Sequence, residues 1–204
     1  PAGANCMQES LKQGKVVSLP KVNTIADGTA VKTPGSNIFP YVQKNVDKIV
    51  TVDDRELIVN FLDIVENHKM IVENSGLLTV SALKQLDCKG KKVVCILSGG
   101  NMDVITMSSV VQHGLIQRGR VFTVSVQLPD RPGELLRVAD VIAKVQGNII
   151  RLEHNQFVSI NRNAAVELTI TMEAFGNEHK MQIIDELTKA GYSPKMEQPT
   201  AMYQ

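Results

Sequence analysis

Residues 16–116 alternate short, β-branched apolar runs with amphipathic stretches. Near-continuous apolar runs are typical of parallel strands that helices cover on both faces, so the alternation predicts an α/β unit with a parallel sheet. The clearest helix is 54–66, because its apolar residues recur at helical spacing and Asp53 and Asp54 stand at its start. The predicted strands are 16–19, 49–52, 69–73 and 93–97, and the other predicted helices are 37–47, 75–86 and 104–117.

The second part of the chain has the pattern of a smaller, antiparallel unit. Residues 121–128 and 165–173 alternate apolar and polar positions, which predicts strands with one buried face. Two further strands are predicted at 148–154 and 192–197, and the order βαββαβ is that of a ferredoxin-like split unit. The basic, glycine-containing segment 118–120 is interpreted as a linker, which gives the units 1–118 and 119–204.

The two helices of this smaller unit are expected to bury one apolar stripe each. The first should end at Gly147, where a glycine commonly terminates a helix. The second should cover about 177–190 and end at Gly191. The residues expected to face the core are Leu135, Val138, Ala139, Ile142 and Val145 in the first helix, and Met181, Ile184 and Leu187 in the second.

Composition and charge narrow the classes of ligand. The chain has 22 basic and 21 acidic side chains, which gives it no electrostatic attraction for nucleic acid or anionic membranes. No apolar run approaches the roughly 20 residues that span a bilayer, and the N-terminus lacks a signal peptide pattern, so we expect a cytoplasmic protein with small neutral or zwitterionic ligands. The three cysteines share no metal-ligand spacing, and the first residue, Pro1, suggests a processed, engineered or partial sequence.

The segment VVCILSGGN (93–101) is the strongest candidate for chemistry. It is an apolar strand followed by Ser98, two glycines and Asn101 before a predicted helix. Ligands of open α/β sheets bind at the carboxyl ends of strands, and glycines let the main chain approach a flat ring or an anion. On spacing alone, a tight strand-to-helix turn explains the segment equally well.

With its surroundings, this loop resembles fold-type II pyridoxal-phosphate enzymes, especially threonine ammonia-lyases and serine racemases. The other matching segments are TIADGTAV (24–31), Pro34-Gly35, Val46-Asp47 and the glutamate of VENSG (72–76). The resemblance implies part of a tryptophan-synthase-β-like parallel-sheet domain over 1–118 and pyridoxal 5'-phosphate as cofactor. By matched position, the implied cofactor residues are Ser98 at the ring nitrogen, Gly99, Gly100 and Asn101 around it, and Gly28 and Glu73 near the ring.

The segment QLPDRPGEL (127–135) resembles the first loop of an ACT regulatory domain, which assigns that family to residues 119–204. The resemblance implies an amino-acid or nucleotide effector at a subunit interface, and a homodimer or homotetramer assembled partly through paired ACT domains. The implied effector residues are Asp130, Arg131, Pro132, Gly133, Glu134 and Leu135, with Asn148 and Ile149 of the next strand close by. The sequence leaves the identity of the effector open.

The implied reaction converts L-threonine to 2-oxobutanoate and ammonia, with L-serine as a lesser amino-acid substrate. A neutral serine at the ring nitrogen gives a hydrogen bond without a full charge, which suits β-elimination. The family's Schiff-base lysine lies in a Ser-aromatic-Lys motif and its cofactor phosphate in a run of glycines, and neither is found here. We therefore expect no catalytic residue in this chain and no activity from it alone.

A divalent metal is not expected. Relatives that bind one use a backbone carbonyl at the position of Ala4 and an aspartate at that of Cys6, where a thiol replaces the hard oxygen ligand. Two other functions stay open: a non-catalytic ACT protein that senses amino acids or oligomerises, and a serine dehydratase or racemase-like enzyme. An upstream Ser-aromatic-Lys would favour the enzyme, a start codon beside Pro1 the sensor, and the ACT segment argues against a racemase.

Overall fold

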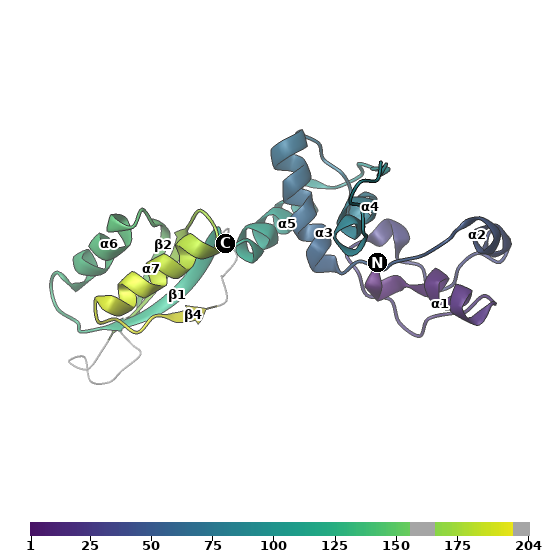
Figure 1. The fold of residues 1–204 in the computed structure, drawn as a ribbon. Helices are drawn as coiled ribbons and strands as arrows, with labels where there is room; N and C mark the ends of the chain where they lie inside the picture. Colours follow the sequence, from purple (N-terminus) through teal and green to yellow (C-terminus); the bar gives the residue numbers. More distant parts are fainter. Residues whose placement is uncertain (156–165, 198–204) are drawn as a thin grey trace. The chain divides into compact units, whose positions relative to one another are not determined.

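The computed structural model of this chain describes residues 1–155 and 166–197 (Figure 1). It separates into two compact units, Pro1–Gly114 and Leu115–Gln204. Helices and an antiparallel sheet make up these units, so the expected mixture of α and β structure is present. The assignment of 1–118 and 119–204 to two named domains stays a prediction. Among the described residues, none of the helices has both the length and the apolar character to cross a membrane.

Short helices joined by long extended segments form the first unit. Its α-helices are α1 (Cys6–Gln13), α2 (Phe39–Asn45), α3 (Asp54–Asp63), α4 (Leu78–Ser81) and the greater part of α5 (Val104–Gln117), which begins in this unit. Single 3-10 turns lie at Ala2–Ala4, Asp27–Thr29, Asn74–Leu77 and Ala82–Gln85, and a π-helical turn, Ile64–His68, extends α3. The helices predicted at 37–47, 54–66, 75–86 and 104–117 are therefore confirmed, with shifts of a few residues at their ends.

The parallel sheet predicted for this unit is wrong. In the described part of the unit, the runs 16–19, 49–52, 69–73 and 93–97 are extended but form no strand ladder. Isolated hydrogen bonds replace it, such as those from Leu19 N to Lys32 O (2.9 Å) and from Thr79 Oγ1 to Ile96 O (3.0 Å). A strand needs a partner along its length, and Val94, 89% exposed, is not covered by a helix as a central strand would be.

Helix α3 carries the core of the first unit. Leu57 and Phe61 are fully buried on it, and burying each such side chain contributes roughly 1.5–3 kcal/mol. Its N-terminus is capped by Asp53, whose Oδ1 accepts a hydrogen bond from Arg55 N at 2.9 Å. A Cβ at Gly114 of α5 would lie 2.7 Å from Leu62 Cδ1, so α5 packs closely on α3 at this glycine.

The second unit is a four-stranded sheet with two helices. Its elements are β1 (Val121–Leu128), α6 (Glu134–Lys144), β2 (Asn148–Asn155), β3 (Val166–Glu173), α7 (Asn177–Lys189) and β4 (Lys195–Glu197). The strand order is β2-β3-β1-β4, and every neighbouring pair is antiparallel. The predicted order βαββαβ is confirmed, and residue 165 of the predicted strand 165–173 lies outside the described residues.

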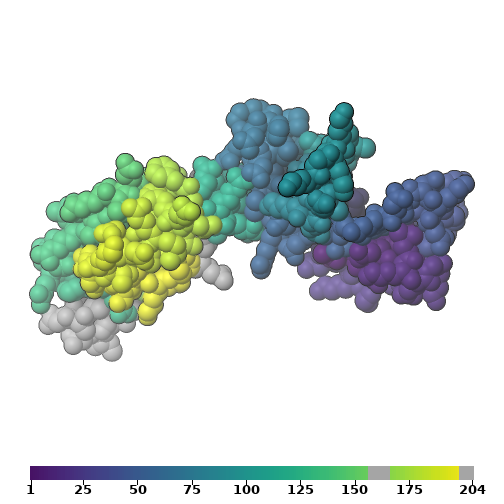
Figure 2. Space-filling model, viewed as in Figure 1, coloured from purple at the N-terminus to yellow at the C-terminus, as the bar shows by residue number. Residues whose placement is uncertain are grey.

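Both helices pack on the same face of this sheet, with α7 in front of β1 in Figure 1 and on the surface of the unit in Figure 2. Val138 and Ile142 of α6, and Leu187 of α7, are fully buried against alternate residues of β1 and β3, as their spacing predicts. Two expectations are wrong: Leu135 is 43% and Met181 51% exposed. Each helix is rotated so that a narrower stripe faces the sheet, and Ile183 takes the inward position of α7.

The turn after α6 also differs from the expectation. The helix ends at Lys144, and Gln146 rather than Gly147 adopts the left-handed backbone conformation, with φ of 62°. A Cβ at Gly147 would lie 2.7 Å from Ile142 Cγ2 and 3.0 Å from Ile183 Cδ1. Gly147 is therefore required for close packing between the turn and the helices, not for a left-handed cap.

Candidate functional site

Three segments that the sequence singled out meet at Glu73. The amide of Glu73 donates to the carbonyl of Gly99 at 3.3 Å, and the amide of Asn101 donates to Glu73 Oε2 at 3.3 Å. Gly28 approaches from the segment 24–31, since a Cβ there would lie 3.3 Å from Glu73 Oε1 and 3.0 Å from Ser75 Oγ. The structure thus brings Gly28, Glu73, Gly99 and Asn101 together, although up to 73 positions separate them in the chain.

Glycine is required at Gly99 for two reasons. Its φ is +81°, a left-handed conformation that disfavours any other residue, and a Cβ there would lie 2.3 Å from the carboxyl carbon of Glu73. A second glycine, Gly76, was not recognised from the sequence. A Cβ at Gly76 would lie 2.0 Å from the carbonyl oxygen of Ser98, so the backbone of the loop rests directly on the turn after Glu73.

Ser98, directly before Gly99, has a hydroxyl that is open to a ligand. The residue is exposed, and within the described part of the chain its hydroxyl makes no hydrogen bond. Gly100 is open as well, because a Cβ there would meet only the carbonyl oxygen of Ile71, at 3.6 Å. Ser98 is therefore free to pair with a ligand, while Gly100 leaves room for that ligand to approach the main chain.

A hollow of about 530 Å³ lies beside Glu73. Buried Asn74 borders it and donates from Nδ2 to the carbonyl of Ile25 at 3.0 Å. Asn74 Oδ1 and Ser75 Oγ are buried polar atoms with no hydrogen-bond partner in residues 1–155 and 166–197. Such atoms are rare in folded proteins. The lining residues come from three segments: Thr24, Ile25, Asp27, Glu73, Asn74, Asn101, Met102, Asp103, Ile105, Thr106, Ser109 and Val110.

Asp103 fixes the start of α5 at the edge of this hollow. Its Oδ1 accepts from the amides of Ile105 and Thr106, both at 2.9 Å, and its Oδ2 accepts from the Thr106 hydroxyl at 2.5 Å. The Thr106 hydroxyl bond, followed by the amide bonds, holds the pKa of Asp103 below its ordinary value. The carboxylate therefore stays ionised at neutral pH and caps the helix that follows the glycine loop.

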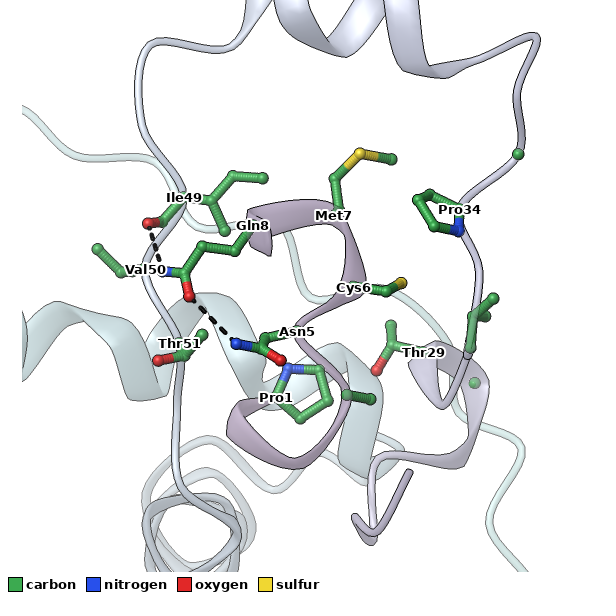
Figure 3. Close-up of a pocket in the computed structure, with 14 residues that line it drawn as sticks. Pro1, Asn5, Cys6, Met7, Gln8, Thr29, Pro34, Ile49, Val50 and Thr51 are labelled. Carbon is green, nitrogen blue, oxygen red and sulfur yellow. Dashed lines mark hydrogen bonds between the residues drawn. The ribbon is translucent and has the colours of Figure 1, made fainter. Parts of the chain in front are cut away.

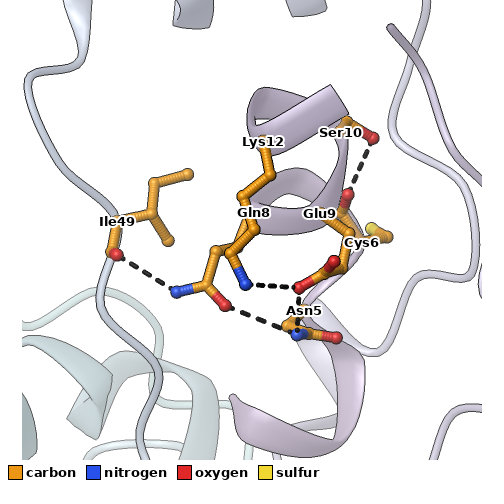
Figure 4. A network of polar contacts seen from close by, with 7 residues as sticks. All are labelled: Asn5, Cys6, Gln8, Glu9, Ser10, Lys12 and Ile49. Atoms are coloured by element: carbon orange, nitrogen blue, oxygen red, sulfur yellow. Dashed lines mark hydrogen bonds and ion pairs between the residues drawn. The ribbon is translucent and has the colours of Figure 1, made fainter. Parts of the chain in front are cut away.

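A second hollow, of about 400 Å³, surrounds the N-terminal end of α1 (Figure 3). Buried Cys6 borders it, while Asn5 and Gln8 are held by protein partners (Figure 4). Gln8 Nε2 donates to the carbonyl of Ile49 at 3.2 Å, and Asn5 Nδ2 donates to Glu9 Oε1 at 3.3 Å. Among the described residues, no three His, Cys, Asp or Glu side chains are grouped as metal ligands would be.

In the second unit, the candidate effector loop lies between β1 and α6. Gly133 has φ of +95° at the start of α6, and Glu134 pairs with Arg137 at 3.1 Å. We expected Asn148 and Ile149 to lie close to this loop. Within one chain, that expectation is wrong. Asn148 pairs with Glu173, which pairs with Val121 at the start of β1, whereas the loop follows the end of β1.

The physical reason is the direction of β2. Both β1 and β2 are antiparallel to β3, so they run the same way, and α6 returns the chain to the start of β1. At about 3.4 Å per residue, Asn148 lies roughly 24 Å from the end of β1. Instead of contacting the loop, the side chain of Asn148 contacts β3, where its Nδ2 donates to Glu173 Oε2 at 2.8 Å. The effector roles of all eight residues stay predictions.

This chain is similar to pyridoxal-phosphate-dependent enzymes of known sequence. Residues 1–99 match the model of a family described as pyridoxal-phosphate dependent enzyme. The chain is 39% identical over 194 residues to the L-threonine ammonia-lyase of Geobacter sulfurreducens, covering 94% of this chain and 48% of that protein. It is 32% identical over 191 residues to the L-threonine ammonia-lyase of Thermotoga maritima, covering 93% and 48%.

A solved structure resembles it too, the processed form of threonine deaminase isoform 2 from Solanum lycopersicum. The identity is 30% and the TM-score 0.51, over 55% of this chain and 34% of that one. The chain spans about half the length of the curated relatives it matches.

Proposed function

We propose that this chain supplies one wall of the cofactor site of a threonine ammonia-lyase, because residues 1–99 match the model of the pyridoxal-phosphate dependent enzyme family and the chain is similar to L-threonine ammonia-lyases. The observation that carries the proposal is the convergence of Gly28, Glu73 and Gly99 beside the free hydroxyl of Ser98. Similarity to L-threonine ammonia-lyases over 94% of the chain supports threonine as the substrate. The products would be 2-oxobutanoate and ammonia, with L-serine converted less well.

The residues at the site fit pyridoxal phosphate. An uncharged hydroxyl at Ser98 suits the ring nitrogen, Gly100 leaves the approach to the main chain open, and Glu73 packs on Gly99 and is held in place by the amide of Asn101. When bound, the cofactor draws electrons from the α-carbon of an amino acid and so permits loss of its proton and β-hydroxyl. Ser98 would hold the ring through a hydrogen bond that carries no full charge.

The 204 residues by themselves are proposed to be inactive, since none of their lysines follows a Ser-aromatic pair. The test is incubation of the purified chain with pyridoxal phosphate and L-threonine, followed by assay of 2-oxobutanoate. We expect no release above a control without protein. Release in proportion to the chain's concentration would show that one of these lysines serves the reaction and would contradict the assignment.

An intact protein that contains these residues and a lysine in that context is expected to release 2-oxobutanoate from L-threonine faster than pyruvate from L-serine. A protein of this kind that racemises L-serine without eliminating its hydroxyl would favour the racemase-like alternative. The proposed preference for threonine over serine rests on the similarity to the relatives. No described residue here recognises the additional methyl group of threonine.

The second unit is proposed to be an ACT regulatory domain that binds an amino-acid or nucleotide effector. Its βαββαβ order and the loop 129–133 ahead of α6 support the proposal. Since Asn148 and the loop lie at opposite ends of the sheet, a ligand that touches both would require two copies of the chain. The need for two copies favours the homodimer or homotetramer over a monomer. It is equally compatible with the alternative of a non-catalytic sensor.

A further inference from the structure

Asp53 and Asp54 look alike in the sequence, as an acidic pair at a helix start, but they make different contacts. Asp53 caps α3 through the amide of Arg55. The carboxylate of Asp54 instead binds the segment that leads to Gly28. Its Oδ1 accepts from the hydroxyl of Thr24 at 2.6 Å, and its Oδ2 accepts from the amide of Ile25 at 2.9 Å.

This segment is held from a second side as well. The hydroxyl of Thr24 also accepts from the amide of Ala26 at 3.1 Å, and Ala26 is fully buried. The carbonyl of Ile25 accepts from Asn74 Nδ2 at 3.0 Å. The amide and the carbonyl of Ile25 are thus bound by two different elements, α3 and the turn after Glu73. Gly28 follows three residues later, beside Glu73 and Ser75.

We propose that Asp54 is a positioning residue, which holds Thr24 and Ile25 so that Gly28 stays beside Glu73. The inference rests on the proposed cofactor site. Asp54 does not line the 530 Å³ hollow, so it would act on the site only through this segment. Hydrogen bonds to an ionised carboxylate are stronger than neutral ones, and both oxygens are used.

The chemistry of an amide at this position gives a sharp test. Asp54→Asn keeps the size of the side chain but leaves only one oxygen acceptor, so an NH₂ group would face either the Ile25 amide or the Thr24 hydroxyl. Asp53→Asn is the matched control, because it removes a carboxylate from the same helix end, where both acids interact with the helix dipole. A general effect on α3 would appear in both variants.

The experiment compares the wild-type chain with these two variants by amide hydrogen exchange at Ile25, Ala26 and Gly28, and by titration with 4-deoxypyridoxine 5'-phosphate. This probe has the ring and phosphate of the cofactor but no aldehyde, so it does not react with surface lysines. For Asp54→Asn we expect exchange at Ile25 to rise about tenfold and probe affinity to fall about tenfold. For Asp53→Asn we expect both to stay within about twofold of wild type.

Unchanged exchange in Asp54→Asn overturns the positioning role, and so does faster exchange with unchanged probe affinity. A wild-type chain that does not bind the probe contradicts the proposed function instead, and the exchange at Ile25 and Gly28 then decides on the positioning role. Thr24→Val removes the hydroxyl from the same network and leaves the carboxylate intact. It gives the same comparison, with a smaller expected change, if Asp54→Asn does not fold.

Discussion

Gly99→Ala is expected to weaken binding of 4-deoxypyridoxine 5'-phosphate by about a hundredfold, because it combines a clash with backbone strain. The new Cβ would lie 2.3 Å from the carboxyl carbon of Glu73, and φ at this residue is +81°. To accept the methyl group, either Glu73 or the loop must move. Movement of the Glu73 side chain breaks the bond from Asn101 N to Glu73 Oε2, and movement of the loop also breaks the bond from Glu73 N to Gly99 O.

Gly90→Ala separates these two effects in the same unit. Gly90 has φ of +73°, close to that of Gly99, but a Cβ there would meet no atom within 4 Å. The control therefore carries the strain without the clash, and we expect it to bind the probe as the wild type does. Fluorescence titration of both variants measures the difference. Equal affinity in Gly99→Ala and wild type would mean that the contact with Glu73 does not shape the site.

Leu168→Ala is expected to destabilise the second unit by about 2–5 kcal/mol. Leu168 is fully buried in β3. It belongs to the core that β1 and β3 form with α6 and α7. Truncation removes apolar contacts and leaves a cavity in the core between the sheet and its two helices.

Amide hydrogen exchange along β3 measures this cost, since it reports on the second unit alone even though the chain has two. The control is Leu136→Ala, which makes the same truncation on a side chain that is 73% exposed. It should change stability by no more than about 0.5 kcal/mol. Similar exchange in the two variants would contradict the assignment of β3 to the core.

The elements that the sequence predicted well are those determined by neighbouring residues. Helix 104–117 and strand 121–128 have the predicted bounds, because Asp103 caps the first and the alternation of apolar residues defines the second. The prediction of four parallel strands was wrong because it depended on residues far away in the chain. A run such as VVCIL (93–97) specifies an extended apolar segment, but a strand also needs a partner from elsewhere in the chain.

The same distinction applies to the candidate site. Residue motifs indicated Gly28, Glu73, Gly99 and Asn101, and the structure brings them together. The contacts of Asp54 were missed, because its carboxylate binds Thr24, 30 positions away, while its neighbour Asp53 makes the helix cap that the sequence does predict. Likewise, no local pattern shows that Asn148 begins its strand at the end of the sheet opposite the effector loop.

The central claim is that the loop 98–101, Glu73 and Gly28 form the ring side of a pyridoxal-phosphate site. The most direct measurement is a titration of the ¹⁵N-labelled chain with 4-deoxypyridoxine 5'-phosphate, followed by amide NMR. The amides of Gly28, Glu73, Gly99 and Asn101 should shift together with one dissociation constant, and Ser98→Ala should raise that constant about tenfold. Shifts confined to other residues, or equal affinity in Ser98→Ala and wild type, would contradict it.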